Sequence, residues 1–200
     1  MKSRPYQMSA RAEAVEQTGT RIADAMLARF ADLPYDQIRL EDVATDAGVT
    51  VQTVLRRFDG KAGVMRVVVE RELGAIAAAR AAAATDRPEQ VVADLVTHYE
   101  RYGALILKAY SEAPFIEGLP VLVAAGRAFH LDWCRTAFAD HLEPGLDRAT
   151  KKRRVAQLTA ICDATTWRIL RRDLGLSQAQ VRVALTELIL PLLDARRPVR

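Results

Sequence analysis

The chain has 200 residues, of which 50% are hydrophobic and 27% are charged, and its formal net charge is +4 at pH 7. This length and apolar content support a buried core and exclude a chain that is disordered over most of its length. No charged-then-apolar leader opens the sequence and no apolar run approaches about 18 residues, so we expect a cytoplasmic protein that does not span a membrane.

Apolar residues recur at spacings of three and four along the chain, whereas alternation with a period of two never persists. The predicted fold class is therefore all-α. A first helix is expected over about residues 10–31, ahead of the turn at Pro34 and Tyr35. The residues expected to be buried on this helix are Val15, Ile22, Met26 and Phe30.

Two short amphipathic helices are predicted between residues 40 and 64, on either side of a turn at Gly48. Their apolar positions are Val43, Ala44 and Ala47 in the first helix and Val51, Val54, Leu55 and Phe58 in the second. Gly48 can adopt the left-handed conformation that closes a helix, and Thr50 can cap the next one by accepting a hydrogen bond from a free backbone N–H. A short turn with glycine between two short helices is typical of a helix-turn-helix unit, whose second helix enters the major groove of DNA.

The polar residues of the second short helix have the chemistry needed to contact DNA. Gln52 and Thr53 lie in its first turn, where base edges are reached, and a glutamine can pair bidentately with adenine. Arg56 and Arg57 follow one turn later, where an arginine can contact guanine or a phosphate. Lys61 comes at the expected start of the next helix, where its ammonium and free backbone N–H groups could hold a phosphate. An ordinary helical hairpin with a solvated polar face is the alternative for this segment.

Bulk charge does not by itself indicate DNA binding, because residues 1–66 hold ten Lys and Arg against nine Asp and Glu. The basic residues Lys2, Arg4 and Arg11 could lie along a minor groove, or they could form a solvated tail. The positions of the charges, rather than their number, carry the DNA-binding hypothesis.

The segment DVATDAGVTVQTVLRRFDGKAGVM resembles the DNA-binding domain of TetR-family transcriptional repressors, and the resemblance covers roughly residues 11–69. The matching positions are Val43-Ala44, Ala47-Gly48-Val49-Thr50, Thr53, Phe58 and Lys61. Two positions depart from the family pattern. Leu55 stands where the family usually has a tyrosine that contacts a phosphate, and Gln52 stands where it often has a small residue. The candidate DNA-binding residues are Arg39, Thr50, Val51, Gln52, Thr53, Arg56, Arg57 and Lys61.

Helical patterns fill the rest of the chain. A fourth helix is expected from about Lys61 into the alanine-rich residues 75–84, and a break at Thr85 and Asp86 precedes a helix opened by Pro88. The apolar face of that helix is formed by Val91, Leu95, Tyr99, Tyr102 and Ile106. Further helices are expected over residues 120–142, 149–174 and 177–194, and the last is preceded by Gly175 and opened by a capping box of Ser177 and Gln180.

The last two predicted helices are apolar on more than one side, and excess apolar surface often packs against another subunit. In TetR-family proteins the corresponding pair forms the dimer interface, so the resemblance implies a homodimer that binds a palindromic operator in double-stranded DNA. It also implies a pocket for a small-molecule effector inside the helical bundle. The candidate ligand-binding residues are Tyr99, Tyr102, Ile106, Phe129, His130, Trp133, Thr166 and Trp167. No charged group is evident among them, so an apolar or aromatic effector is expected.

Cys134 and Cys162 lie far apart within helical patterns, and they are expected to be reduced core thiols rather than a disulfide. His130 and Cys134 stand four residues apart, a spacing that places two metal ligands on one helix face. Further ligands would have to come from His98, His141 or Cys162, none of which is paired locally, and no metal site or other cofactor is predicted.

The sequence therefore predicts two domains, a helix-turn-helix DNA-binding domain over residues 10–70 and an effector-binding and dimerisation bundle over residues 71–200. The predicted function is a ligand-responsive transcriptional regulator that acts as a repressor. One alternative is a TetR-like accessory protein without specific DNA binding, which the departure at Leu55 keeps open. The other is a helical-bundle enzyme, although the sequence has no HExxH, no paired-cysteine motif and no glycine-rich phosphate loop.

Overall fold

The computed structural model describes residues 4–82, 87–142 and 146–194, and within these ranges it contains helices and no strand. The predicted all-α fold is confirmed. Two compact units are present. Unit 1 comprises the described residues up to Glu72 together with Ser111–Leu122, and unit 2 comprises Leu73–Tyr110 and the described residues from Val123 onward. No helix in the described ranges is long and apolar enough to cross a membrane.

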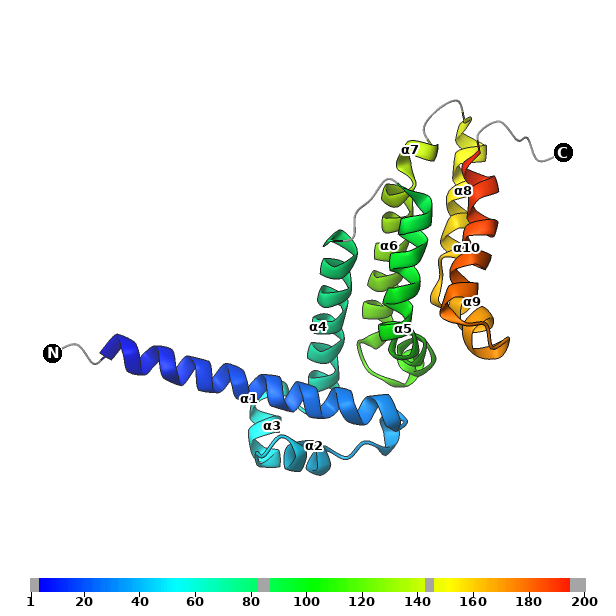
Figure 1. Ribbon diagram of the computed structural model, residues 1–200. Coiled ribbons are helices and arrows are strands. Elements are labelled where there is room, and N and C mark those ends of the chain that lie inside the picture. The colour runs from blue at the N-terminus through cyan, green and yellow to red at the C-terminus, as the bar shows by residue number, and fades with distance from the viewer. Residues whose placement is uncertain (1–3, 83–86, 143–145, 195–200) are drawn as a thin grey trace. The chain divides into compact units, whose positions relative to one another are not determined.

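Unit 1 is built on α1 (Arg4–Asp32), α2 (Leu40–Asp46), α3 (Val51–Phe58) and the beginning of α4 (Lys61–Ala82). The α2 helix packs against both α1 and α3, as Figure 1 shows. Fully or almost fully buried side chains form the core of this unit: Ile22, Met26, Phe30, Ile38, Val43, Val54, Val64 and Met65. A segment distant in sequence also joins the unit, because the backbone N–H of Tyr35 donates to Glu112 Oε2 at 3.1 Å.

Two residues that were expected to be buried in unit 1 are exposed. Val15 is 53% exposed, because all of residues 13–17 are exposed and this turn of α1 has no packing partner among the described residues. Leu55 is 42% exposed, because Val54 and Phe58 occupy the inner face of α3 and a neighbouring position points away from it. The predictions for Ile22, Met26 and Phe30 are confirmed.

Unit 2 is a helical bundle. Its elements are the end of α4, all but the end of α5 (Pro88–Glu112), all but the start of α6 (Leu119–Ala137), α7 (Ala139–Leu142), α8 (Arg148–Ile161), α9 (Ala164–Arg168), a π-helical turn (Ile169–Asp173) and α10 (Gln178–Leu193). The α8 and α10 helices lie side by side in Figure 1. The bundle core includes Val92, Leu95, Val96, Phe138, Leu142, Leu158, Trp167, Val181, Leu185 and Ile189.

The helix boundaries in unit 2 differ from the predicted ones at two places. The helix predicted over residues 149–174 is broken after Ile161, because the Asp163 carboxylate accepts a hydrogen bond from the Thr165 N–H at 2.7 Å and caps a new helix. The helix predicted over residues 120–142 is interrupted at Phe138. The break after Ile161 was not predicted, because Cys162 is buried and the apolar spacing continues past Asp163.

The predicted starts of two helices are confirmed. The α5 helix opens at Pro88, although the predicted break at Thr85 and Asp86 lies outside the described residues. The capping box at α10 is complete, since the Gln180 N–H donates to Ser177 Oγ at 3.3 Å and the Ser177 N–H donates to Gln180 Oε1 at 2.8 Å.

Candidate DNA-binding face and bundle pocket

The turn between α2 and α3 has the geometry that the sequence predicts. Gly48 has a φ of 65°, in the left-handed region, and the Val49 N–H donates to the Ala44 carbonyl at 2.9 Å. Thr50 caps α3, because its hydroxyl oxygen accepts a hydrogen bond from the Thr53 N–H at 3.2 Å. The start of α3 is therefore fixed by local contacts before any packing with the rest of unit 1.

The outward face of α3 carries Gln52 and Arg56, which are both exposed. They stand four residues apart and so lie on one side of the helix. Neither side chain has a hydrogen bond or an ion pair within the part of the chain that the structure describes. Thr53 is half-buried and its hydroxyl lies 3.0 Å from that of Thr50, while Val51 is half-buried beside them. Gln52 and Arg56 are thus available to a partner outside unit 1.

Arg57 and Arg39 are placed differently from Arg56. The Arg57 guanidinium lies over α1 at Gly19, where an added Cβ would be 2.6 Å from Arg57 Nε. A side chain at position 19 of α1 would therefore displace the end of the Arg57 side chain, which is free to move. The Arg39 side chain is 74% exposed and lies 3.9 Å from Glu41, an ion pair too exposed to hold it firmly.

Lys61 has a structural role that the sequence did not indicate. Its Nζ donates to the carbonyl oxygens of Tyr35 at 2.7 Å and Ile38 at 2.9 Å, and it lies 4.2 Å from the centre of the Tyr35 ring. Burial lowers the pKa of this ammonium, an effect partly offset by the charge of Asp36. Two of its three N–H donors are committed to the backbone, which ties the η1 turn (Tyr35–Gln37) to the start of α4.

The predicted basic arm can be placed only in part. Lys2 lies outside the described residues, and Arg4 and Arg11 lie within α1. The arm therefore remains a prediction.

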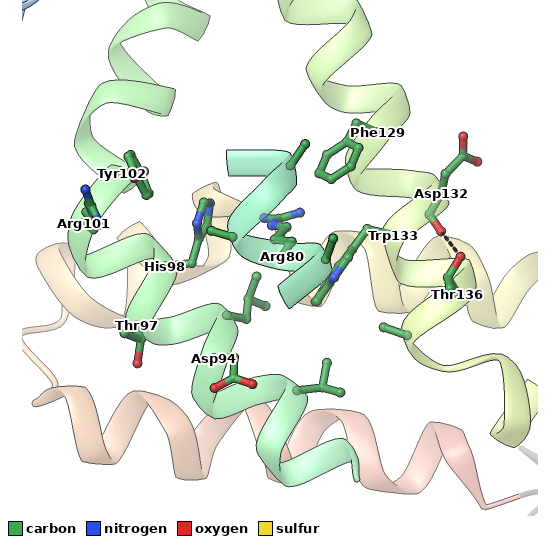
Figure 2. A pocket seen from close by; sticks show the side chains of 16 residues that line it. Arg80, Asp94, Thr97, His98, Arg101, Tyr102, Phe129, Asp132, Trp133 and Thr136 are labelled. Carbon is green, nitrogen blue, oxygen red and sulfur yellow. Dashed lines mark hydrogen bonds between the residues drawn. The ribbon is translucent and has the colours of Figure 1, made fainter. Parts of the chain in front are cut away.

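Unit 2 contains a cavity of about 580 Å³. Its lining comes from the end of α4, from α5 and from α6, and includes Arg80, His98, Tyr102, Phe129, Trp133 and Thr136. Figure 2 shows Arg80 near the middle of this lining, with His98 on one side of it and Phe129 and Trp133 on the other. The volume is within the range of about 300–1,000 Å³ that is usual for small-molecule sites.

Arg80 is the central charge of the pocket and is only 8% exposed. One terminal nitrogen lies 3.1 Å from His130 Nδ1, and the other donates to the Tyr99 hydroxyl at 3.3 Å. The guanidinium carbon lies 4.7 Å from the centre of the Trp133 ring, at a distance suited to a cation–π contact. All of these partners are neutral, and no carboxylate of the described residues pairs with Arg80.

The groups behind Arg80 are fixed in one protonation pattern. Since Arg80 donates to His130 Nδ1, the proton of a neutral His130 ring is on Nε2, which lies 3.1 Å from the Thr159 carbonyl oxygen and donates to it. Tyr99 donates its own proton to the Cys162 carbonyl oxygen at 2.7 Å, and burial raises its pKa. The guanidinium is therefore held in place by an ordered set of neutral groups.

His98 differs from His130 because its two ring nitrogens are buried and have no hydrogen-bond partner within the described residues. Burial lowers the pKa of His98 to about 3, and the charge of Arg80 acts in the same direction. The ring is thus neutral near pH 7, with one donor and one acceptor unused.

The predicted ligand-binding residues separate into three groups. Tyr102, Phe129 and Trp133 line the cavity, whereas Tyr99 and His130 lie behind it and hold Arg80. The other three do not line it: Ile106 packs against the core, Thr166 donates to the Ala160 carbonyl, and Trp167 donates to Glu100.

Sequence reasoning missed Arg80 and His98, and it gave the pocket no charged group. The structure corrects this, since Arg80 is turned inward. The available signal was that Arg80 is the only charged residue in the alanine-rich run of residues 75–84. A long side chain without a polar neighbour on its own helix must find its partners on other helices.

Cys134 and Cys162 are free and buried, as predicted. The Cys134 sulfur also lies 3.8 Å from His130 Nε2. Cys134 is 1% exposed and does not line the cavity. No group of three or more potential metal ligands occurs within the described ranges.

Comparison with known structures finds the same architecture. FadR, a fatty acid degradation regulator from Bacillus halodurans, is 17% identical, with a TM-score of 0.63 over 90% of this chain and 96% of that one. FadR from Bacillus subtilis, solved in complex with stearoyl-CoA, is 15% identical, with a TM-score of 0.66 over 89% and 99% of the two chains. A TetR-family regulator from Streptomyces coelicolor A3 is 16% identical, with a TM-score of 0.52 over 89% and 95%.

This chain has the TetR-family fold. The resemblance first indicated by the helix-turn-helix segment is therefore confirmed, and it extends beyond that segment to about nine-tenths of the chain. No protein-family model matches the sequence, and no curated protein matches it either. The likeness is thus one of three-dimensional structure at low sequence identity.

Proposed function

We propose that this protein is a ligand-responsive transcriptional repressor that binds a palindromic operator as a homodimer. The observation that carries the proposal is the outward face of α3, where Gln52 and Arg56 are exposed on a helix whose start is fixed by Thr50. A rigid short helix that presents unpaired glutamine and arginine side chains has the chemistry for reading base edges in a major groove.

The candidate DNA-binding residues then have different roles. Gln52 and Arg56 would contact bases, and phosphates would be contacted by Arg39, just before α2, and by Arg57, in the last turn of α3. Thr50 and Val51 would set the start of the helix, and Thr53 would bring its methyl group or backbone close to the DNA. The roles of Lys61 would be to hold the η1 turn and, with its remaining N–H, to contact a phosphate.

Dimerisation is supported by apolar side chains left exposed on α10, namely Val183 at 57%, Leu188 at 49% and Leu190 at 39%. A second copy of the chain would bury them. In a dimer two α3 helices would lie about one DNA turn apart, or a multiple of it, which requires an inverted repeat in the operator.

Response to a ligand is supported by the cavity in unit 2 and by α4, which starts in unit 1 and lines the cavity with its last turns. FadR from Bacillus subtilis has been solved with stearoyl-CoA, so a protein of similar fold binds a small molecule. In the proposed mechanism, an effector in the cavity shifts α4, changes the separation of the two α3 helices, and releases the operator.

The proposal is tested by capturing genomic fragments with the purified protein at one fixed salt concentration and sequencing what is retained. We expect enrichment of an inverted repeat that a Gln52→Ala, Thr53→Ala variant no longer enriches. The cap of α3 survives in this variant, because the bond to Thr50 comes from the backbone N–H of residue 53. A Gln17→Ala, Thr20→Ala variant, exposed on α1, is the matched control and should enrich the same repeat.

The single change Gln52→Ala should alter preference at one base pair in each half-site by about 1 to 3 kcal/mol. Binding of labelled operator variants, each changed at one position, measures this. A preference profile that is unchanged by Gln52→Ala would contradict base reading by α3. Absence of any enriched repeat would favour a TetR-like accessory protein, for which the exposed Leu55 on α3 is the motivating observation.

A further inference from the structure

The pocket contains a buried positive charge that no acidic group neutralises. Arg80 is 8% exposed, and its hydrogen-bond partners within the described residues, His130 and Tyr99, are both neutral. Burying a guanidinium without an opposite charge is costly, and cation–π contacts with Trp133 offset only part of that cost. An anion in the cavity would remove the imbalance.

Three nitrogen atoms of the pocket also lack hydrogen bonds. Arg80 Nε and both ring nitrogens of His98 are buried and have no partner in the described part of the chain. Buried polar atoms are nearly always paired, so unpaired atoms on side chains that line a cavity indicate a missing partner. Arg80 Nε can only donate, and a neutral His98 has one donor, so the missing partner must offer oxygen acceptors.

The acidic residues at the cavity limit how much negative charge it can accept. Asp94 and Asp132 also belong to the lining, but Asp94 accepts from Gln90 Nε2 at 2.8 Å and Asp132 pairs with Arg135 at 2.9 Å. Neither neutralises Arg80. Arg101 also belongs to the lining but is exposed, so the four charged residues of the lining are two of each sign. The charges of Asp94 and Asp132 would repel a ligand with several negative charges more than one with a single charge, so a singly charged group fits better than a phosphate.

Apart from Arg101, Thr97 and Thr136, the rest of the lining is apolar and aromatic. Tyr102, Phe129 and Trp133 contribute rings, and Ala77, Ala81, Val91, Leu95 and Ala137 contribute small or aliphatic surfaces. Figure 2 shows the rings of Phe129 and Trp133 on the same side of Arg80. A ligand whose charged end meets Arg80 would place an uncharged body against these surfaces.

We propose that the pocket binds a monocarboxylate, whose carboxylate pairs with Arg80 and accepts a hydrogen bond from His98 while its apolar body lies against Trp133 and Phe129. This inference rests on the proposed function only in treating the ligand as the effector. It replaces the uncharged apolar or aromatic effector that the sequence alone suggested, because that expectation did not include Arg80.

The test compares acids with their neutral amides in the absence of DNA. The probes are 2-naphthoic acid with 2-naphthamide, and decanoic acid with decanamide, titrated at pH 7 by calorimetry and by tryptophan emission. In each pair the body is the same and only the charge differs. At least one acid should bind about 10- to 100-fold more tightly than its amide, as expected for charge-assisted hydrogen bonds in a buried site.

An Arg80→Met variant should remove this preference for the acid, with folding verified by circular dichroism. The matched control is Arg127→Met, because Arg127 is an exposed arginine of α6 that stacks on Tyr110 at 4.6 Å and does not line the cavity. The control should keep the preference. If Arg80→Met does not fold, the acid-to-amide ratio of the unaltered protein still decides, since that ratio needs no variant.

Equal affinity of acid and amide in both pairs, or no binding of either acid, would overturn the inference. A preference that persists in Arg80→Met would overturn the role of Arg80. Failure of the proposed function would give a different result. The acid would still bind more tightly than its amide, but either it would not release the captured operator fragments or no operator would be captured at all.

Discussion

The two units of this protein differ in whether the polar side chains of their candidate sites are exposed or buried. In unit 1, Gln52 and Arg56 face outward on α3, and the interior is apolar. In unit 2, Arg80, His98 and His130 face inward and are almost fully buried. A surface that reads a polymer must expose its hydrogen-bonding groups, whereas a pocket that senses a small molecule must enclose them.

The two units also use cationic side chains differently. Lys61 of unit 1 satisfies two backbone carbonyls and so acts within the fold, whereas Arg80 of unit 2 leaves Nε without a partner among the described residues. Lys61, which the sequence assigned to DNA, thus uses two of its three N–H donors within the fold. Arg80, which sequence reasoning overlooked, is the cation with a free donor within the described residues.

The largest effect on unit 1 should come from Gly63→Ala. A Cβ at Gly63 would overlap the carbonyl oxygen of Phe58, at the tight connection between α3 and α4 where Asp59 and Gly60 both have positive φ. Because backbone cannot yield as a side chain end does, we expect a loss of about 3 kcal/mol in unfolding free energy and loss of operator binding. Urea denaturation followed by circular dichroism measures it.

Gly19→Ala is the control for that variant. Its Cβ would meet only the end of the Arg57 side chain, which can move, and alanine favours a helix over glycine by up to about 1 kcal/mol. Both tryptophans, Trp133 and Trp167, belong to unit 2, so their emission reports whether the bundle remains folded in either variant. Equal stability of the two glycine variants would contradict the tight connection between α3 and α4.

Lys61→Met should have the next largest effect, because it keeps the apolar stem and removes the ammonium that donates to Tyr35 and Ile38. We expect the free energy of unfolding to fall by about 2 kcal/mol, since two charge-assisted hydrogen bonds are lost. Lys152→Met, at an exposed position of α8, should change stability little. If Lys61 acted only by contacting a phosphate, stability would be unchanged and only the salt dependence of operator binding would fall, by about one phosphate contact.

Local signals explain how much of unit 1 could be predicted. The glycine turn, the Thr50 cap and the apolar faces of α2 and α3 are encoded within residues 43–58, and the structure confirms the turn, the cap, the face of α2, and Val54 and Phe58 of α3. Leu55 was wrongly assigned to the buried face of α3, because it is apolar and adjacent in sequence to Val54 on that face. The second role of Lys61 depends on carbonyls more than 20 residues earlier, which no local pattern indicates.

The pocket of unit 2 could be predicted only in part for the same reason. Tyr102, Phe129 and Trp133 were predicted because they are aromatic, and the structure brings them to one cavity. The partners of Arg80 lie 19 and 50 residues away, on α5 and α6, so its position depends on how three helices pack. A spacing rule within a single helix could not place it there.

The smallest predicted effect concerns pH and belongs to unit 2. Burial holds the pKa of His98 at about 3, against an ordinary value of 6.5, and Arg80, His130 and the rings of Tyr99 and Tyr102 surround it. Between these two pH values the unfolded chain binds a proton at His98 and the folded chain does not, so stability falls as the pH falls through this window. From pH 7.5 to pH 5.5 this group should account for a loss of about 1 kcal/mol.

A His98→Leu variant isolates this contribution, because carboxylates that titrate in the same range are present in both proteins and cancel in the difference. Urea midpoints are read from tryptophan emission at both pH values. Between pH 7.5 and pH 5.5 the midpoint should fall further in the unaltered protein than in the variant. A difference between the two proteins that does not change with pH would show that His98 keeps its ordinary pKa in the folded state, as a solvated ring does. The pocket would then not enclose its polar side chains as proposed, because a solvated His98 ring has no unpaired nitrogen for a ligand to bind.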